Sequence, residues 1–328
     1  MSQGKLSKTP TNLWRVEGEA FDGRPDVLAT EEPLEIRLRW GDRMRTLALT
    51  MRTPGADAEL AAGFLFAEGV VTERSQIARS TPVGGPLHLP MPPGECSNEI
   101  EVELTGCEEP DLASLERHFF STSACGVCGK AGLETLRLRV TAELPAGPRV
   151  APAVICSLPG KLRTAQGLFE ATGGLHAAAL FTSDGELLAV REDVGRHNTL
   201  DKLVGWALLG GMLPLHDHVL LVSGRTSYEI LQKSAAAGLP VVCAVSAPSS
   251  LAVELAERFG ITLIGFLRGN HFNVYSGLQR IAGAPDAPNP LNPLNPLKMA
   301  ELPAHLESVP AGSEPRRRRF TVLQSRGV

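Results

Sequence analysis

The chain has 328 residues, of which 43% are hydrophobic and 21% charged, and its formal net charge is −4. This composition is typical of a protein that folds in water around a large core, and the weak negative charge argues against nucleic-acid binding. Six cysteines are too few for a disulfide framework in a chain of this length. Because the N-terminus lacks an apolar signal segment and no apolar run is long enough to cross a bilayer, we expect no membrane association and a reducing, cytoplasmic location.

The first hundred residues show the alternation of apolar and polar side chains that is typical of strands. The predicted strands cover residues 34–40, 47–51 and 99–104. Between them, apolar periodicity over residues 57–68 predicts a helix that ends at Gly69. Residues 81–98 are rich in proline and glycine and predict an exposed loop. We therefore divide this part into a flexible N-terminus, residues 1–12, and an N-terminal β-rich region, residues 13–118.

From residue 155 onward, predicted helices and strands alternate. The predicted strands cover residues 175–182, 186–190, 219–223, 240–245 and 261–266. The predicted helices cover residues 198–209, 228–237 and 251–259, and a further helix ends near Gly174. One hairpin, turning at Asp184-Gly185, followed by repeated strand–helix units implies a mixed sheet with helices on its faces. The predicted fold class is therefore α/β (α+β), with a domain over residues 155–282 and a disordered, proline-rich tail over 283–328 that has no catalytic role.

The sequence Cys125-Gly-Val-Cys128-Gly lies within a predicted cysteine loop and connection, residues 119–154. A glycine after each thiol permits positive φ and close approach by a partner, and Lys130 favours the reactive thiolate. The chain has no second Cys-x-x-Cys, so a closed zinc site would have only half of its usual ligands. We therefore expect thiol chemistry, with Cys125 and Cys128 as catalytic residues that accept and relay sulfur. An incidental pair and half of a zinc site are the alternatives.

Three loops follow strands of the predicted sheet and share glycine, arginine and small polar residues. They cover residues 192–198, 223–228 and 266–271. Ligands of open α/β sheets bind at the carboxyl ends of strands, and helix N-termini and arginines attract phosphate. We expect a phosphate-bearing ligand here, bound by His197, Ser223 and Arg225, with Asn198 capping the helix predicted over residues 198–209. His197 is also a candidate proton shuttle.

Other polar residues near these loops have structural interpretations. His176 either faces the same cleft or is a hydrogen-bonded histidine of the sheet. Glu192 and Asp193 are interpreted as structural salt-bridge partners of Arg196 or Arg225, in preference to acid–base catalysts.

Four segments together resemble the FdhD family of formate dehydrogenase accessory sulfurtransferases, also called NarQ-like. They are residues 119–130 (FFSTSACGVCGK), 172–176 (TGGLH), 192–198 (EDVGRHN) and 223–229 (SGRTSYE). Residues 31–34 and 53–55 fit the same family, and the resemblance covers roughly residues 13–277. It implies a cytidine-deaminase-like fold in the C-terminal part, a smaller N-terminal β-rich region and a homodimer.

The resemblance also implies sulfur transfer from a cysteine desulfurase to the bis-molybdopterin guanine dinucleotide form of the molybdenum cofactor, before that cofactor reaches formate dehydrogenase. By motif position, Cys125 matches the cysteine that carries the persulfide, and Cys128 matches the second cysteine of its loop. The stretch that binds the cofactor matches Phe266, Leu267, Arg268, Gly269, Asn270 and His271. The sequence leaves open which dehydrogenase and desulfurase take part, and whether sulfur passes from Cys125 to Cys128.

Three other functions fit parts of the sequence. A thiol–disulfide oxidoreductase would use the same cysteine pair, but the glycines disfavour the helix that such a site needs. A zinc deaminase requires His-x-Glu and Pro-Cys-x-x-Cys, whereas this chain has His176-Ala-Ala, and Ala124 precedes the cysteine pair, so we expect no zinc. A non-catalytic chaperone for the molybdenum cofactor would need the anion site but not the thiols.

Overall fold

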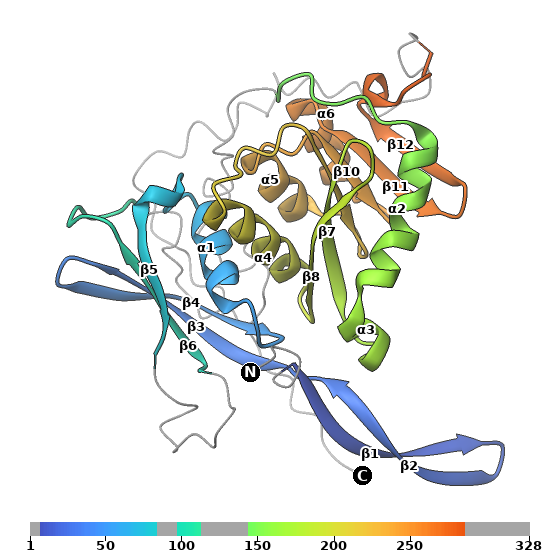
Figure 1. The fold of residues 1–328 in the computed structure, drawn as a ribbon, viewed down its shortest axis with the longest axis horizontal. Coiled ribbons are helices and arrows are strands. Elements are labelled where there is room, and N and C mark those ends of the chain that lie inside the picture. The colour runs from blue at the N-terminus through green and yellow to red at the C-terminus, as the bar shows by residue number, and fades with distance from the viewer. Residues whose placement is uncertain (1–6, 84–96, 113–143, 286–328) are drawn as a thin grey trace, which may run out of the picture. The chain divides into compact units, whose positions relative to one another are not determined.

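Within residues 7–83, 97–112 and 144–285, which the computed structural model describes, the strands form three sheets (Figure 1). A two-stranded hairpin consists of β1 (Lys8–Glu17) and β2 (Ala20–Ala29). A four-stranded sheet in the order β4-β3-β6-β5 consists of β3 (Glu32–Trp40), β4 (Arg43–Arg52), β5 (Ile77–Pro82) and β6 (Glu99–Leu104). In this sheet β3 and β6 are parallel, and the other neighbours are antiparallel.

The largest sheet has the order β12-β11-β10-β9-β7-β8. Its strands are β7 (His176–Thr182), β8 (Leu187–Asp193), β9 (His218–Val222), β10 (Val241–Ala244), β11 (Thr262–Arg268) and β12 (His271–Ser276). β9, β10 and β11 are mutually parallel, whereas β7 is antiparallel to both β8 and β9. The carboxyl ends of β8, β9, β10 and β11 therefore lie at one edge of the sheet, together with the first residue of β7.

Helices cover both faces of this six-stranded sheet (Figure 1). The helices are α1 (Asp57–Ala67), α2 (Pro152–Ala165), α3 (Gly167–Thr172), α4 (Arg196–Leu209), α5 (Tyr228–Ala236) and α6 (Ser250–Phe259), with 3-10 turns at Arg74–Gln76 and Leu278–Arg280. Successive strand residues point to opposite faces. Leu180 accordingly packs in the core formed with α4, α5 and α6, while the next residue, Phe181, packs with α2.

α1 connects the four-stranded sheet to the larger one, because it packs on the former and crosses α4. Leu208 of α4 belongs to the same buried cluster as Leu60 and Leu65 of α1. At the crossing, a Cβ atom on Gly63 would lie 1.9 Å from the Asp201 carbonyl oxygen. A Cβ on Gly205 would lie 1.8 Å from the carbonyl oxygen of Glu59. The two glycines thus allow backbone-to-backbone contact between the helices.

The predicted fold class is confirmed: a mixed sheet has flanking helices, and a smaller β-rich region precedes it. Several details differ from the prediction, which also lacked β2 and β5. β1 begins at Lys8, inside the segment expected to be flexible. The predicted helix before Gly174 is two helices, α2 and α3. α4 starts at Arg196 with Gly195 as its N-cap, so the predicted cap by Asn198 is wrong. The last predicted strand extends to Arg268 and pairs with a further strand, β12.

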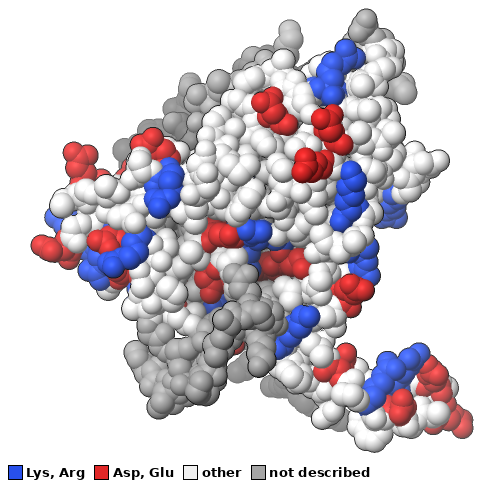
Figure 2. Space-filling view, in the orientation of Figure 1, with Lys and Arg blue, Asp and Glu red and all other residues white. Residues whose placement is uncertain are grey.

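Charged side chains of both signs are interspersed on the face shown in Figure 2. The hairpin of β1 and β2, at the lower right, carries acidic and basic groups next to one another, including the ion pair of Arg15 and Glu17. It also exposes large apolar side chains, with Trp14 73% and Phe21 70% accessible. None of the described helices combines the length and apolar character needed to cross a membrane.

Candidate functional site at the carboxyl edge of the large sheet

The edge where β8, β9, β10 and β11 end carries all three loops that the sequence singled out. Ser223 follows β9, and its Oγ accepts a hydrogen bond from the backbone N–H of Ala177 in β7 (2.9 Å). The loops after β9 and β10 are joined by an isolated bridge. The Phe266 N–H donates to the Ser246 carbonyl oxygen (3.1 Å) and so connects the third loop. The three predicted loops therefore form one continuous edge.

His176, the first residue of β7, lies half-buried at this edge. A Cβ on Gly224 would be 3.3 Å from its Nδ1 atom, so glycine lets the ring lie against the loop after β9. Burial and the nearby positive charge of Arg196 lower the pKa of His176, and Asp193 opposes this shift. His176 therefore favours its neutral form. Arg225, in the loop after β9, is exposed to solvent.

The segment from Phe266 to His271 forms the end of the β11–β12 hairpin, not a loop before a helix. Arg268, Gly269, Asn270 and His271 are exposed. Leu267 is fully buried in the core, so only its backbone is available to a ligand. Phe266 has φ of +53°, an unusual value for a bulky side chain, and is 37% exposed. Three neighbouring polar side chains and an aromatic ring thus project from one turn.

His197, predicted to bind phosphate or shuttle protons, is only 3% exposed. Its Nε2 atom lies 3.4 Å from the Ser227 Oγ, and its Nδ1 atom lies 3.5 Å from Glu229 Oε2. The imidazole is therefore held between a hydroxyl and a carboxylate of the adjacent loop and helix. Any contact between His197 and a ligand at the edge would pass through Ser227 or require the loop to move.

Behind His197, three more charged groups are buried between α4 and α5. Lys233 Nζ binds both carboxylate oxygens of Asp201 (2.6 and 2.8 Å) and lies 3.7 Å from Glu229. Burial raises the pKa of Asp201 to about 6, although the attraction of Lys233 opposes it. Burial alone would lower the pKa of Lys233, but the carboxylates of Asp201 and Glu229 outweigh it and raise that pKa. Lys233 therefore favours its charged form within this acidic cluster.

A second buried network joins the end of β8 to the chain that follows β4. Asp193 is fully buried, and its Oδ2 lies 2.6 Å from Lys202 Nζ and accepts the Thr53 N–H (3.1 Å). Its Oδ1 accepts hydrogen bonds from the Gly195 N–H (2.8 Å) and from Asn198 Nδ2 (3.0 Å). Lys202 also donates to the Thr53 carbonyl oxygen (2.8 Å). Every oxygen of this carboxylate is paired, as burial of a charge requires.

Glu192 has a different structural role from the predicted one. Its carboxylate accepts the backbone N–H groups of Leu168 (3.0 Å) and Phe169 (2.7 Å) at the start of α3. Among the described residues, neither Glu192 nor Asp193 pairs with Arg196 or Arg225, so that part of the sequence interpretation is wrong. Both carboxylates are nevertheless structural, because each satisfies buried or helix-terminal donors.

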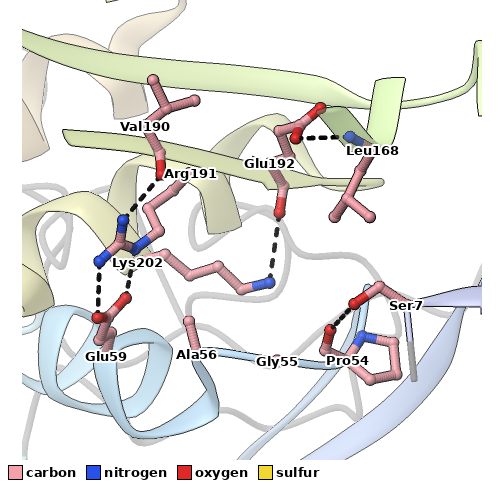
Figure 3. A pocket seen from close by; sticks show the side chains of 10 residues that line it. All are labelled: Ser7, Pro54, Gly55, Ala56, Glu59, Leu168, Val190, Arg191, Glu192 and Lys202. Atoms are coloured by element: carbon pink, nitrogen blue, oxygen red, sulfur yellow. Dashed lines mark hydrogen bonds and ion pairs between the residues drawn. The ribbon is translucent and has the colours of Figure 1, made fainter. Parts of the chain in front are cut away.

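A pocket of about 310 Å³ lies beside this second network (Figure 3). Its lining residues are Ser7, Pro54, Gly55, Ala56, Glu59, Leu168, Val190, Arg191, Glu192 and Lys202. The charged groups around it are engaged with one another: Arg191 Nη2 donates to Glu59 Oε1 (2.7 Å), and Lys202 is bound to Asp193. Glu192, the remaining charged residue of the lining, accepts the backbone N–H groups of Leu168 and Phe169, so each charged side chain around the pocket already has a partner.

The catalytic candidates Cys125 and Cys128 lie outside the described residues, as do Cys96 and the tail beyond residue 285. Of the described cysteines, Cys107 is exposed, Cys156 is intermediate and Cys243 is buried in β10. In the part of the chain that the structure describes, no three His, Cys, Asp or Glu residues are grouped so that they could hold a metal ion.

Several residues that surround the candidate site were given no individual role from the sequence, although Thr53, Ser227 and Glu229 lie within its motifs. These are Thr53, Asp201, Lys202, Ser227, Glu229 and Lys233. Glu229 and Lys233 are four residues apart on a short helix and share its buried side with Ile230. Charged residues at such apolar positions are a usable signal of a buried polar network.

These features define an α/β protein with a helix-covered mixed sheet and a polar site at the carboxyl edge of its strands. The sequence model of the FdhD/NarQ family matches residues 29–282, and the chain belongs to this family. A crystal structure described as a formate dehydrogenase accessory protein from Desulfotalea psychrophila has the same fold, with a TM-score of 0.63 and 24% sequence identity. That alignment covers 84% of this chain and 99% of the other.

Curated relatives are similar over most of their length. The sulfur carrier protein FdhD of Streptomyces coelicolor is 51% identical over 271 residues, which are 82% of this chain and 93% of the relative. The protein of the same name from Mycobacterium tuberculosis is 48% identical over 260 residues, or 79% and 92% of the two chains. That from Sulfurisphaera tokodaii is 44% identical over 269 residues, or 82% and 97%.

Proposed function

We propose that this protein is a cytoplasmic sulfur carrier that takes sulfur from a cysteine desulfurase as a persulfide on Cys125. The sulfur acceptor would be the bis-molybdopterin guanine dinucleotide form of the molybdenum cofactor, and the enzyme that receives this cofactor would be a formate dehydrogenase. The observation that carries this proposal is membership of the FdhD/NarQ family, with 51% identity to a relative named as a sulfur carrier. The Cys125-Gly-Val-Cys128 motif supplies the thiols that such a role requires. By the family resemblance, the working form would be a homodimer.

The first step is an exchange at sulfur that involves no net oxidation. The Cys125 thiolate attacks the outer sulfur of the desulfurase persulfide, and the electron pair of the broken S–S bond returns to the desulfurase cysteine. Release of the sulfur as sulfide then requires two electrons. Attack of the Cys128 thiolate on the Cys125 Sγ supplies them, because it expels sulfide and leaves a disulfide between the two cysteines. A cellular thiol reductant restores the starting state.

The edge described above supports the choice of an anionic substrate. The acceptor carries several phosphates, which bind well to guanidinium groups and helix N-termini. Arg225 and Arg268 are exposed at that edge, and Asn270 and His271 provide further hydrogen-bonding groups beside them. In this proposal the edge binds the substrate, and Cys125 carries the persulfide that is transferred to it.

Mass spectrometry after incubation with a cysteine desulfurase and free cysteine tests the proposal. The peptide that contains residues 125–128 should gain about 32 Da, the mass of one sulfur atom. This gain should be absent in Cys125→Ala and unchanged in Cys107→Ala, which removes an exposed thiol that the proposal does not use. No gain in the wild-type protein, with the desulfurase shown to be active on another acceptor, would refute sulfur carriage.

A non-catalytic chaperone for the same substrate is the second candidate, because the exposed edge residues could bind it without the cysteines. Under that alternative, Cys125→Ala would leave dehydrogenase maturation intact and Arg268→Ala would abolish it. Loss of maturation in Cys125→Ala, with the folded state retained, supports sulfur transfer instead.

A further inference from the structure

Ser227 and Ser249 are the N-cap residues of α5 and α6, and their hydroxyl groups have different partners. Ser249, the N-cap of α6, accepts a hydrogen bond from the Ala252 N–H, as capping serines normally do. Ser227 is the N-cap of α5 and has an extended backbone, yet among the described residues its hydroxyl accepts no bond from the first turn. It lies instead 3.4 Å from Nε2 of His197. The hydroxyl is therefore directed at an imidazole and not at its own helix.

The imidazole has a carboxylate on its other nitrogen. His197 Nδ1 lies 3.5 Å from Glu229 Oε2, and both side chains are almost fully buried. A carboxylate at Nδ1 selects the tautomer that carries its proton there, which leaves Nε2 as the acceptor for a hydroxyl proton. Nucleophile, base and carboxylate thus occur in the order in which hydrolytic triads use them. The contacts are loose, as such contacts often are before a ligand binds.

Glu229 is itself fixed from behind. Lys233 lies 3.7 Å from it and is bound to Asp201, so the carboxylate is anchored on the side away from the histidine. These four side chains come from two helices, which pack against each other in the core: α4 carries His197 and Asp201, and α5 carries Glu229 and Lys233. A rigid, water-excluded support of this kind is what positions a catalytic base.

The surroundings of Ser227 favour an anionic electrophile. Arg225 is exposed two residues before it, and Arg196 is half-buried at the start of α4. The N-terminus of α5 begins at the next residue, Tyr228, and its dipole attracts negative charge. Guanidinium groups and a helix N-terminus stabilise the charge that develops on the oxygens of a transferring phosphoryl group.

We propose that Ser227, His197 and Glu229 form a catalytic relay that makes Ser227 a nucleophile toward phosphate esters, an activity separate from sulfur transfer. Ser227 Oγ attacks phosphorus while its proton passes to His197 Nε2. The bond to the leaving oxygen breaks, that oxygen keeps the electron pair, and His197 returns the proton to it. A water molecule then hydrolyses the phosphoserine by the same relay. Ser227 and His197 are the catalytic residues, and Glu229 is a positioning residue.

The test uses the full-length protein and two probes, a fluorophosphonate that traps activated serines and 4-nitrophenyl phosphate. We expect a covalent adduct on the peptide that contains Ser227, and a burst of nitrophenolate equal to the amount of protein. Both should be lost in Ser227→Ala, and His197→Gln should slow them about 100-fold or more, as loss of a general base does. Ser249→Ala is the matched control, since it removes the corresponding serine of the next helix.

The positioning role of Glu229 is tested by a measurement that a loss of folding would not reproduce. Glu229→Gln should slow adduct formation, and Glu229→Asp should recover part of the rate, with thermal unfolding confirming that each variant is folded. The absence of an adduct on Ser227 in the wild-type protein would overturn the proposal, as would an adduct whose rate is unaffected by His197→Gln. An adduct without release of nitrophenolate would overturn the assignment to phosphate esters.

Discussion

Replacing Gly205 with alanine should force α1 and α4 apart. The added Cβ would lie 1.8 Å from the Glu59 carbonyl oxygen and 2.8 Å from the Gly63 nitrogen, and both are backbone atoms that cannot rotate away. Because real contacts of this kind are essentially never shorter than 3.0 Å, the helices would have to separate by at least 1.2 Å at their crossing. That movement would also open the buried cluster to which Leu60 and Leu208 belong.

Overpacking of a core, including the backbone shifts that it forces, typically costs about 1–3 kcal/mol and occasionally more. The contact here is with backbone atoms that cannot rotate away, which favours the upper end of that range. We therefore expect Gly205→Ala to lower the free energy of unfolding by about 3 kcal/mol or more. For a domain of this size, that corresponds to a fall of roughly 10 °C in Tm. Urea denaturation followed by tryptophan fluorescence is a suitable assay, because Trp206 is next to the substituted residue.

Gly160 provides the matched control. It lies within α2, and no atom is within 4 Å of the position that its Cβ would occupy. Gly160→Ala should therefore raise the free energy of unfolding by up to about 1 kcal/mol through helix propensity alone. A Gly205→Ala protein that is as stable as the wild type would refute the close crossing of the two helices.

Three further predictions concern titratable groups. The pKa of Asp201 is raised from 3.8 to about 6 in the folded protein, so protonation of this carboxyl group favours folding. Its contribution to the free energy of unfolding is about 3 kcal/mol, and it is lost as the pH rises from about 4 through 6. Unfolding curves of Asp201→Asn should lack this slope, and an unchanged slope would contradict the assignment. NMR titration should give His176 a pKa below 6.5 that rises in Arg196→Gln, and no rise would exclude Arg196 as a cause. In the native protein iodoacetamide should modify Cys107 before Cys243, whose pKa is raised by burial; equal rates would show that β10 opens readily.

Apart from β12, the strands of the large sheet were predictable because their signals are local, and so were the helices α4, α5 and α6. β10 is a short apolar run, and α6 has an apolar face, so each could be recognised without its neighbours. β1 and β2 were not recognised, since they pair with each other and leave Trp14 and Phe21 exposed. With little burial to select an alternating pattern, their sequence gives no strand signal.

The candidate site was predictable to the level of its loops and not of its contacts. The carboxyl ends of parallel strands share an edge in any such sheet, which brings the predicted loops together. The partners of individual side chains depend on tertiary packing. His197 and Ser227 are thirty positions apart, and Lys202 reaches Thr53 across 149 positions, so no local pattern indicates either contact.

The network around Asp193 and Lys202 has a consequence for where the chain can be divided. A fragment that ends at residue 112 would retain Thr53 and α1. It would lose Asp193 and Lys202, to which the Thr53 backbone is hydrogen-bonded, and α4, against which Gly63 packs. A fragment that begins at residue 144 would open the same ion pair to water. We therefore expect that neither half folds on its own, and that the two separated fragments assemble with each other when they are mixed.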